Sequence, residues 1–219
     1  MHLTAAKRSL CYLKQTADHK LCYPRASRLA ERPPAEVVIH GFTDTDWAGN
    51  ELTRKSVGGC IFFAGPSLGV AQVQGTTSMR TTSAIHWQSR TQKVIALSTL
   101  EVEYIAFSDA VREAIWVSWL LADIIGAGSS LSRAGFSSLP APVDIGCDNQ
   151  GALKLIETGV CKQKTKHIDI KYHHVRDEVE KGTIWCYYVR STDNPADLLT
   201  KALPAPRSGA LASMAGLRP

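Results

Sequence analysis

Hydrophobic and polar positions alternate along residues 143–147, where Val143, Ile145 and Cys147 occupy every second position. This spacing predicts a β-strand with one buried face over 142–148. Other apolar stretches rich in β-branched and aromatic residues, each bounded by turn-forming residues, predict four further strands. They cover residues 37–44, 56–65, 84–90 and 183–189.

A helical spacing of hydrophobic residues replaces this pattern between Thr99 and Ile125 and predicts one long helix. Shorter helices are predicted at 4–16, 150–158, 165–181 and 195–203. From residue 36 onward the elements follow the order βββ, α, β, α, α, β, α. This order predicts an α/β fold with a mixed sheet and helices on its faces.

The chain has 219 residues, of which 44% are hydrophobic, enough for a sizeable core. We divide it into a helix with a linker (1–35), a main domain (36–204) and a disordered tail (205–219) rich in Ala, Gly, Ser and Pro. No apolar run of about 18 residues predicts a membrane span, and early charges argue against a signal peptide. We therefore expect an intracellular protein that is not secreted and has no membrane partner.

The cysteines and basic residues by themselves indicate little about function. The six cysteines form no C-x-x-C pair, so we expect reduced thiols and neither a disulfide framework nor a zinc site. The net charge of +5 is mildly basic, and positive residues gather in one short segment. A polyanion-binding surface and an ordinary solvated helix face both fit this pattern. The segment contains Lys162, Lys164, Lys166, His167, Lys171, His173 and His174.

Four carboxylates stand at the ends of predicted elements: Asp44, Glu103, Asp148 and Asp197. Asp148 could simply cap the helix that follows it, and Asp197 has a position near a helix start that favours acids. The S-T-L-E sequence at 98–101 predicts a capping box that leaves Glu103 unexplained. If the four meet in one place, divalent cations must offset their repulsion. Oxygen ligands favour magnesium or manganese, and two such ions can hydrolyse a phosphodiester.

A resemblance sharpens this picture. The motifs FTDTDWAG, LSTLEVEYIA, CDNQGAL, TKHIDIKYHHVRDEV and NPADLLTKALP occur in this order between about Gly41 and Pro204. Together they resemble the ribonuclease H domain at the C-terminal end of copia-type LTR retrotransposon polyproteins. The segment AAKRSLCYLKQTAD is similar to the one that follows the reverse transcriptase thumb, which makes 1–35 a remnant of that connection.

The resemblance implies a ribonuclease H-like fold, a mixed five-stranded sheet whose first three strands are antiparallel, flanked by helices. It implies an endoribonuclease that hydrolyses the RNA strand of RNA·DNA hybrids with two Mg²⁺ ions, for which Mn²⁺ can substitute, and with no other small-molecule cofactor. The implied partners are the hybrid and the reverse transcriptase domain of the same polyprotein. The implied location is a cytoplasmic particle or the nucleus.

Carried over residue by residue, the resemblance makes Asp44 (F-T-D), Glu103 (E-Y-I-A), Asp148 (C-D-N-Q) and Asp197 (P-A-D-L-L) the catalytic and metal-binding set. Asp46 and Glu101 compete for the first two places. The expected nucleic-acid contacts are phosphates for the basic segment and 2′-hydroxyls for the residues after Asp148. These contacts are assigned to Asn149, Gln150, Lys162, Lys164, Lys166, His167 and Lys171.

The sequence also departs from the family pattern. The loop VRSTDNPAD lacks the histidine that many ribonucleases H carry there, and Leu100 replaces a usual threonine. The loops at 65–84 and 126–141 look extended and could hinder hybrid binding. The alternative function is therefore a catalytically decayed remnant that at most binds nucleic acid weakly. A strand transferase is disfavoured by the E-Y-I-A and P-A-D-L-L-T-K helices.

Overall fold

The structure is a computed structural model that describes residues 2–23, 37–49, 52–66, 83–124, 142–158 and 166–219. The side chains of residues 166–170 and of a few others lie outside that description, as do the two extended loops at 65–84 and 126–141 for most of their length. The elements are α1 (His2–Gln15), β1 (Lys20–Leu21), β2 (Val37–Asp46), β3 (Val57–Pro66), β4 (Ala84–Thr91), α3 (Thr99–Ile124), β5 (Val143–Cys147), α5 (Gln150–Thr158), α6 (Lys166–Glu180), β6 (Ile184–Tyr188), η4 (Ser191–Asp193), α7 (Asp197–Thr200), α8 (Ala205–Met214) and β7 (Leu217–Arg218).

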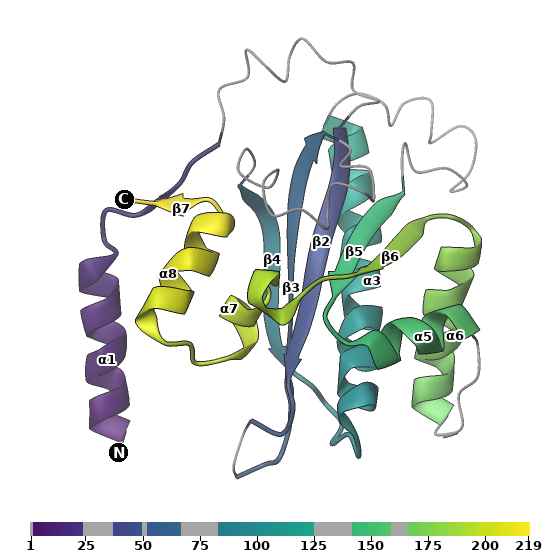
Figure 1. The fold of residues 1–219 in the computed structure, drawn as a ribbon, viewed down its shortest axis with the longest axis horizontal. Helices are drawn as coiled ribbons and strands as arrows, with labels where there is room; N and C mark the ends of the chain where they lie inside the picture. Colours follow the sequence, from purple (N-terminus) through teal and green to yellow (C-terminus); the bar gives the residue numbers. More distant parts are fainter. Residues whose placement is uncertain (1, 24–36, 50–51, 67–82, 125–141, 159–165) are drawn as a thin grey trace.

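The central sheet has the strand order β4-β3-β2-β5-β6 (Figure 1). Strands β2, β3 and β4 pair antiparallel, whereas β5 and β6 run parallel to β2 and to each other. This topology confirms the expected ribonuclease H-like fold class. Because β5 is parallel to β2, both strands end at the same edge of the sheet, and the residues that follow them come close together.

Each face of the sheet carries its own hydrophobic core. The face covered by α3, α5 and α6 buries Ile39, Phe62, Ile145 and, from α3, Phe107. The opposite face buries a second cluster, of which the C-terminal residues Ala196 and Ala215 form part. Adjacent residues of β3 alternate between the two clusters, as the two-residue period of a strand requires. The C-terminal segment is therefore one of the two layers that cover the sheet.

The predicted elements of the main domain are found with their ends shifted by one or two residues, except for the last helix. Residues 195–203 were expected to form one helix, but α7 spans only Asp197–Thr200 and follows the short η4 turn. Residues 194–196 lie between the two, and Asn194 Oδ1 accepts a hydrogen bond from the Ala196 amide at 3.1 Å. A side chain thus holds the turn that precedes α7, and the helix ends where the backbone becomes extended at Lys201.

The prediction of a disordered tail at 205–219 is wrong. Helix α8 occupies most of the segment, and β7 pairs antiparallel with β1 from the N-terminal region. Further hydrogen bonds run from the Cys22 amide to the Gly216 carbonyl and from the Ala84 amide to the Ala215 carbonyl, both 3.0 Å. Buried Leu211 and Ala215 supply apolar contacts that composition alone did not predict.

No helix in the described ranges is long and apolar enough to cross a membrane.

Candidate metal centre

Asp44 lies near the end of β2, the central strand of the sheet. It pairs in register with Gly59 of β3, and its side chain is only 1% exposed. A Cβ atom at position 59 would lie 2.8 Å from Leu199 and 2.9 Å from Thr200, so a glycine is needed for α7 to pack this closely beside Asp44. The backbone of β3 thus makes room for a helix directly beside a buried carboxylate.

Asp148 follows the last residue of β5, which is parallel to β2. From the sequence alone, Asp148 could have been merely the N-cap of the next helix. The cap is instead Asn149, whose Oδ1 accepts a hydrogen bond from the Ala152 amide at 3.0 Å. Capping by the neighbouring residue leaves the Asp148 carboxylate directed elsewhere.

Glu103 lies in the first turns of α3 and is 8% exposed. Within the described chain, its Oε2 atom is buried without a hydrogen-bond partner. Burial raises the pKa of Glu103 to about 8; the Thr45 side chain opposes this shift, and the negative charges of Asp44 and Asp148 add to it. A buried carboxylate oxygen without a partner is costly to the fold and needs a proton or a cation.

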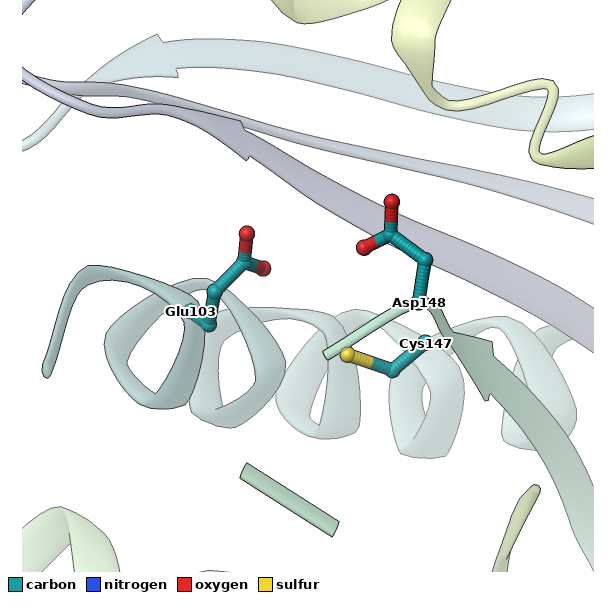
Figure 2. A group of neighbouring side chains, drawn as sticks. All are labelled: Glu103, Cys147 and Asp148. Carbon is teal, nitrogen blue, oxygen red and sulfur yellow. The ribbon is translucent and has the colours of Figure 1, made fainter. Parts of the chain in front are cut away.

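Glu103 and Asp148 form one side of the site together with Cys147. The nearest ligand atoms of the three residues all lie within 4.8 Å of one another. Figure 2 shows Glu103 projecting from α3 and Asp148 from beyond the end of β5, with both carboxylates above the Cys147 sulfur in this view. Burial raises the pKa of the Cys147 thiol, so it stays protonated and is a poor ligand for a hard cation.

Asp197 begins α7 and is 1% exposed. Lys201 bridges it to Asp44. The Lys201 Nζ atom donates to Asp44 Oδ1 at 2.9 Å and to Asp197 Oδ1 at 2.7 Å. The second oxygen of each carboxylate is also occupied, because Thr200 donates to Asp44 Oδ2 and Arg207 of α8 donates to Asp197 Oδ2. Asp44 and Asp197 thus form a second side of the site that is filled by protein donors.

Burial and these contacts together shift the pKa values of Asp44 and Lys201. Burial is the largest influence and raises the pKa of Asp44 to about 6, while the hydrogen bonds from Thr200 and Lys201 act in the opposite direction. Burial alone would lower the pKa of Lys201, but its hydrogen bonds to Asp197 and Asp44 raise it above its ordinary value. Lys201 therefore carries a full positive charge between two acids.

Of the two competing acids, Glu101 is engaged in capping α3, and Asp46 is more exposed than Asp44. Glu101 accepts a hydrogen bond from the Leu97 amide at 2.8 Å, and its own amide donates to Ser98 Oγ at 3.2 Å, so the predicted cap is present. Asp46 is the last residue of β2 and is partly exposed, whereas Asp44 is buried beside Asp197. The geometry therefore favours Asp44 and Glu103 over Asp46 and Glu101.

The residues predicted to contact nucleic acid lie on two helices, α5 and α6, and in a segment outside the described residues. Asn149 and the exposed Gln150 lie at the start of α5, next to Asp148. Lys171 of α6 makes an ion pair with Asp109 of α3 at 2.6 Å. Lys162 and Lys164 lie outside the described residues, and Lys166 and His167 are described only as part of the helix backbone. Their contacts with nucleic acid stay a prediction.

Sequence reasoning missed three residues of the site: Thr200, Lys201 and Arg207. One signal was available, since Asp197 and Lys201 are spaced i, i+4, which places oppositely charged side chains together on a helix. Arg207 carried no such signal because its segment was expected to be disordered.

The carboxylate oxygens of the site are suitable ligands for a hard divalent cation. Glu103 and Asp148 have carboxylate oxygens within 4.8 Å of each other, and Glu103 Oε2 is a buried acceptor available to a cation. The oxygens of Asp44 and Asp197 could bind a cation only in exchange for their hydrogen bonds to Lys201, Thr200 and Arg207. Oxygen-only ligands are those that Mg²⁺ and Mn²⁺ prefer. The arrangement can therefore hold such ions and polarise a phosphate oxygen or a water molecule beside them.

Comparison with known proteins found relatives along nearly the whole chain. It is 32% identical over 204 residues to the "Retrovirus-related Pol polyprotein from transposon TNT 1-94" of Nicotiana tabacum, an alignment that covers 93% of this chain and 12% of that protein. It is 31% identical over 202 residues to the corresponding polyprotein from transposon RE1 of Arabidopsis thaliana, covering 92% of this chain and 11% of the relative. The chain thus spans about one eighth of the length of these relatives.

A solved structure of LC11-RNase H1 in complex with RNA/DNA hybrid aligns with 16% identity and a TM-score of 0.44, covering 74% of this chain and 92% of that one. No family model matches the chain.

Proposed function

We propose that this chain, a homologue of one segment of the copia-type Pol polyproteins of plant transposons, is a metal-dependent endoribonuclease that hydrolyses the RNA strand of RNA·DNA hybrids. The observation that supports the proposal is that carboxylate oxygens of Glu103 and Asp148 lie within 4.8 Å of each other, with Asp44 near the end of the neighbouring strand β2. The negative charges of Asp44 and Asp148 both act on Glu103, and Lys201 joins Asp44 to Asp197. Buried or half-buried acids that act on one another in this way are suited to binding divalent cations.

Two Mg²⁺ ions, held by Asp44, Glu103, Asp148 and Asp197, would when bound supply activation of the attacking water and charge stabilisation at the leaving 3′ oxygen. The residues of the chain provide the fixed positions that this chemistry needs. Strands β2 and β5 orient Asp44 and Asp148, because both are anchored in the central sheet. Helices α3 and α7 bring Glu103 and Asp197 to the same edge.

The proposed substrate contacts come from two segments of the chain. Asn149 and Gln150 follow Asp148 at the start of α5 and are placed to meet the 2′-hydroxyls that distinguish RNA from DNA. The basic residues at 162–171 are proposed to contact phosphates. The proposed partner is the reverse transcriptase domain of the same polyprotein, and the proposed location is a cytoplasmic particle or the nucleus.

A panel of labelled substrates tests the proposal. The purified chain is incubated in Mg²⁺ with an RNA·DNA hybrid, single-stranded RNA, double-stranded RNA and double-stranded DNA of the same sequence. The expected result is cleavage of the RNA strand of the hybrid alone, abolished by EDTA. Equal cleavage of single-stranded RNA would contradict the proposed specificity. No cleavage of any substrate by a folded chain would favour the decayed remnant.

A further inference from the structure

The four acids of the candidate metal centre fall into two pairs that differ in their partners. Asp44 and Asp197 have every carboxylate oxygen bonded to a protein donor, namely Lys201, Thr200 or Arg207. In contrast, Glu103 Oε2 is buried and has no hydrogen-bond partner in the described chain. Cations of the chain are hydrogen-bonded to both acids of the first pair, whereas no such group is hydrogen-bonded to Glu103 Oε2 in the described chain.

Lys201 is the centre of the first pair. Its ammonium group contacts both carboxylates at less than 3 Å, and about two thirds of its side chain is shielded from solvent. Charge-assisted hydrogen bonds of this kind are stronger than neutral ones, particularly where water is excluded. Asp44 and Asp197 would have to give up these hydrogen bonds before they could both bind a divalent ion.

We infer that Lys201 is a resident counter-ion that makes the two halves of the centre unequal in their affinity for divalent ions. The half formed by Glu103 and Asp148 accepts the first divalent ion. The half formed by Asp44 and Asp197 accepts a second ion only when the Lys201 ammonium leaves the position between them. Lys201 is thus a positioning residue that sets the affinity for the second ion. The inference rests on the proposed function, because it concerns the same four acids.

The length of Lys201 permits such a movement. The residue follows the last residue of α7, where the backbone turns to an extended conformation with φ −123° and ψ 146°. Its side chain is 33% exposed, so part of it already borders solvent. A flexible four-carbon side chain can swing outward without moving the backbone.

Lys181, directly after α6, provides a control that is more exposed than Lys201. It also bridges two acids, with Nζ contacting Asp177 at 2.5 Å and Glu178 at 3.3 Å. These acids lie on α6, outside the candidate centre. Substitution of Lys181 therefore removes an equivalent lysine with two acidic partners without touching the four acids.

Manganese titration, with free Mn²⁺ measured by its paramagnetic resonance signal, counts the bound ions and their affinities. Wild type, Lys201→Met, Lys181→Met and Glu103→Gln are compared. We expect the wild type to bind one ion tightly and a second weakly. Lys201→Met should tighten the second ion by about tenfold or more and leave the first within about twofold. Lys181→Met should match the wild type, and Glu103→Gln should weaken the first ion.

An unchanged or weakened second ion in Lys201→Met would overturn the inference. If the tight ion is still present and still depends on Glu103, the proposed function survives that result. If the wild type binds no Mn²⁺ at all, the proposed function and the inference both fail.

A second measurement uses only the wild type, so it does not depend on the folding of a variant. Lysine acetylation is followed by mass spectrometry during a Mg²⁺ titration. Lys201 should be protected without the ion and become reactive over the range in which the second ion binds, while Lys181 keeps a constant reactivity. Protection of Lys201 that persists at saturating Mg²⁺ would overturn the inference.

Discussion

The side-chain amide of Asn194 donates a hydrogen bond of 2.9 Å to the main-chain carbonyl of Thr43, a residue 151 positions earlier in the sequence. Asn194 is fully buried and stands three residues before Asp197, and Thr43 stands directly before Asp44. This hydrogen bond fixes the segment that carries one acid of the centre against the strand that carries another. The distance between the two acids is therefore built into the fold.

Replacing Asn194 by Ala should weaken both the fold and the site. The substitution leaves the Thr43 carbonyl and the Ala196 amide without their partner, which costs about 2 to 4 kcal/mol in the free energy of unfolding. Urea denaturation measures this loss. Asn149→Ala, which removes the cap of α5, serves as a control with an expected loss of about 1 kcal/mol. Equal losses for the two variants would contradict the role given to Asn194.

The stability of the ion-free protein should fall as the pH rises. The folded pKa of Glu103, about 8, lies above its ordinary value of 4.5, so the folded chain retains a proton that the unfolded chain releases. Asp44 has its pKa shifted in the same direction, to about 6. This contribution is fully present below about pH 4.5 and is lost progressively up to about pH 8.

Glu103→Gln tests this linkage, because glutamine does not titrate. Urea denaturation in EDTA between about pH 5 and pH 8 should show a shallower decline for this variant than for the wild type. Glu157→Gln, on the exposed surface of α5, should keep the wild-type slope. Parallel curves for wild type and Glu103→Gln would show that the proton on Glu103 does not contribute.

Lys201→Met should make stability depend strongly on divalent ions. Without Lys201, Asp44 and Asp197 are left buried beside each other with one cation fewer, which costs about 2 kcal/mol and lowers the Tm by about 5 °C in EDTA. Saturating Mg²⁺ binds the folded state and should restore most of the loss. Thermal denaturation with EDTA or Mg²⁺ checks this, and a variant that is equally destabilised in both conditions would contradict it.

The basic segment should control the salt dependence of hybrid binding. Replacing Lys162, Lys164 and Lys166 together by Ala should reduce the slope of log K against log salt by about 2 to 3, because each lysine that meets a phosphate adds about one unit to that slope. Lys171→Ala should change it less, because Lys171 is paired with Asp109. Fluorescence anisotropy with the Asp148→Asn protein measures binding without cleavage. An unchanged slope in the triple variant would remove these lysines from the interface.

Much of the fold could be predicted from the sequence because its elements carry local signals. The alternation of Val143, Ile145 and Cys147 predicts a strand, and the helical spacing from Thr99 predicts α3. The C-terminal segment was mispredicted for a physical reason. Its small residues carry little hydrophobic signal, and β7 is stabilised by pairing with β1, which lies near the opposite end of the chain. Local composition cannot predict a pairing of that kind.

Part of the candidate site could likewise be predicted from the sequence and part could not. Asp44, Glu103, Asp148 and Asp197 were predicted from their places at the ends of elements and from motif resemblance, and their role stays a prediction. The partners of these acids were not found, because Thr200 and Arg207 meet them only through packing of α7 and α8 on the sheet. The choice between Asp148 and Asn149 as helix cap likewise depended on geometry, since both residue types are good caps.

The most direct measurement is cleavage of a labelled RNA·DNA hybrid in Mg²⁺ by the wild type and by Asp148→Asn. The account predicts that the wild type cuts the RNA strand and that the variant, if folded, is slower by about 100-fold or more, since bound metal supplies several kcal/mol of transition-state stabilisation. Equal cleavage by the two proteins would place the reaction outside this centre. No cleavage by a folded wild-type chain at any protein concentration would contradict the proposed enzyme.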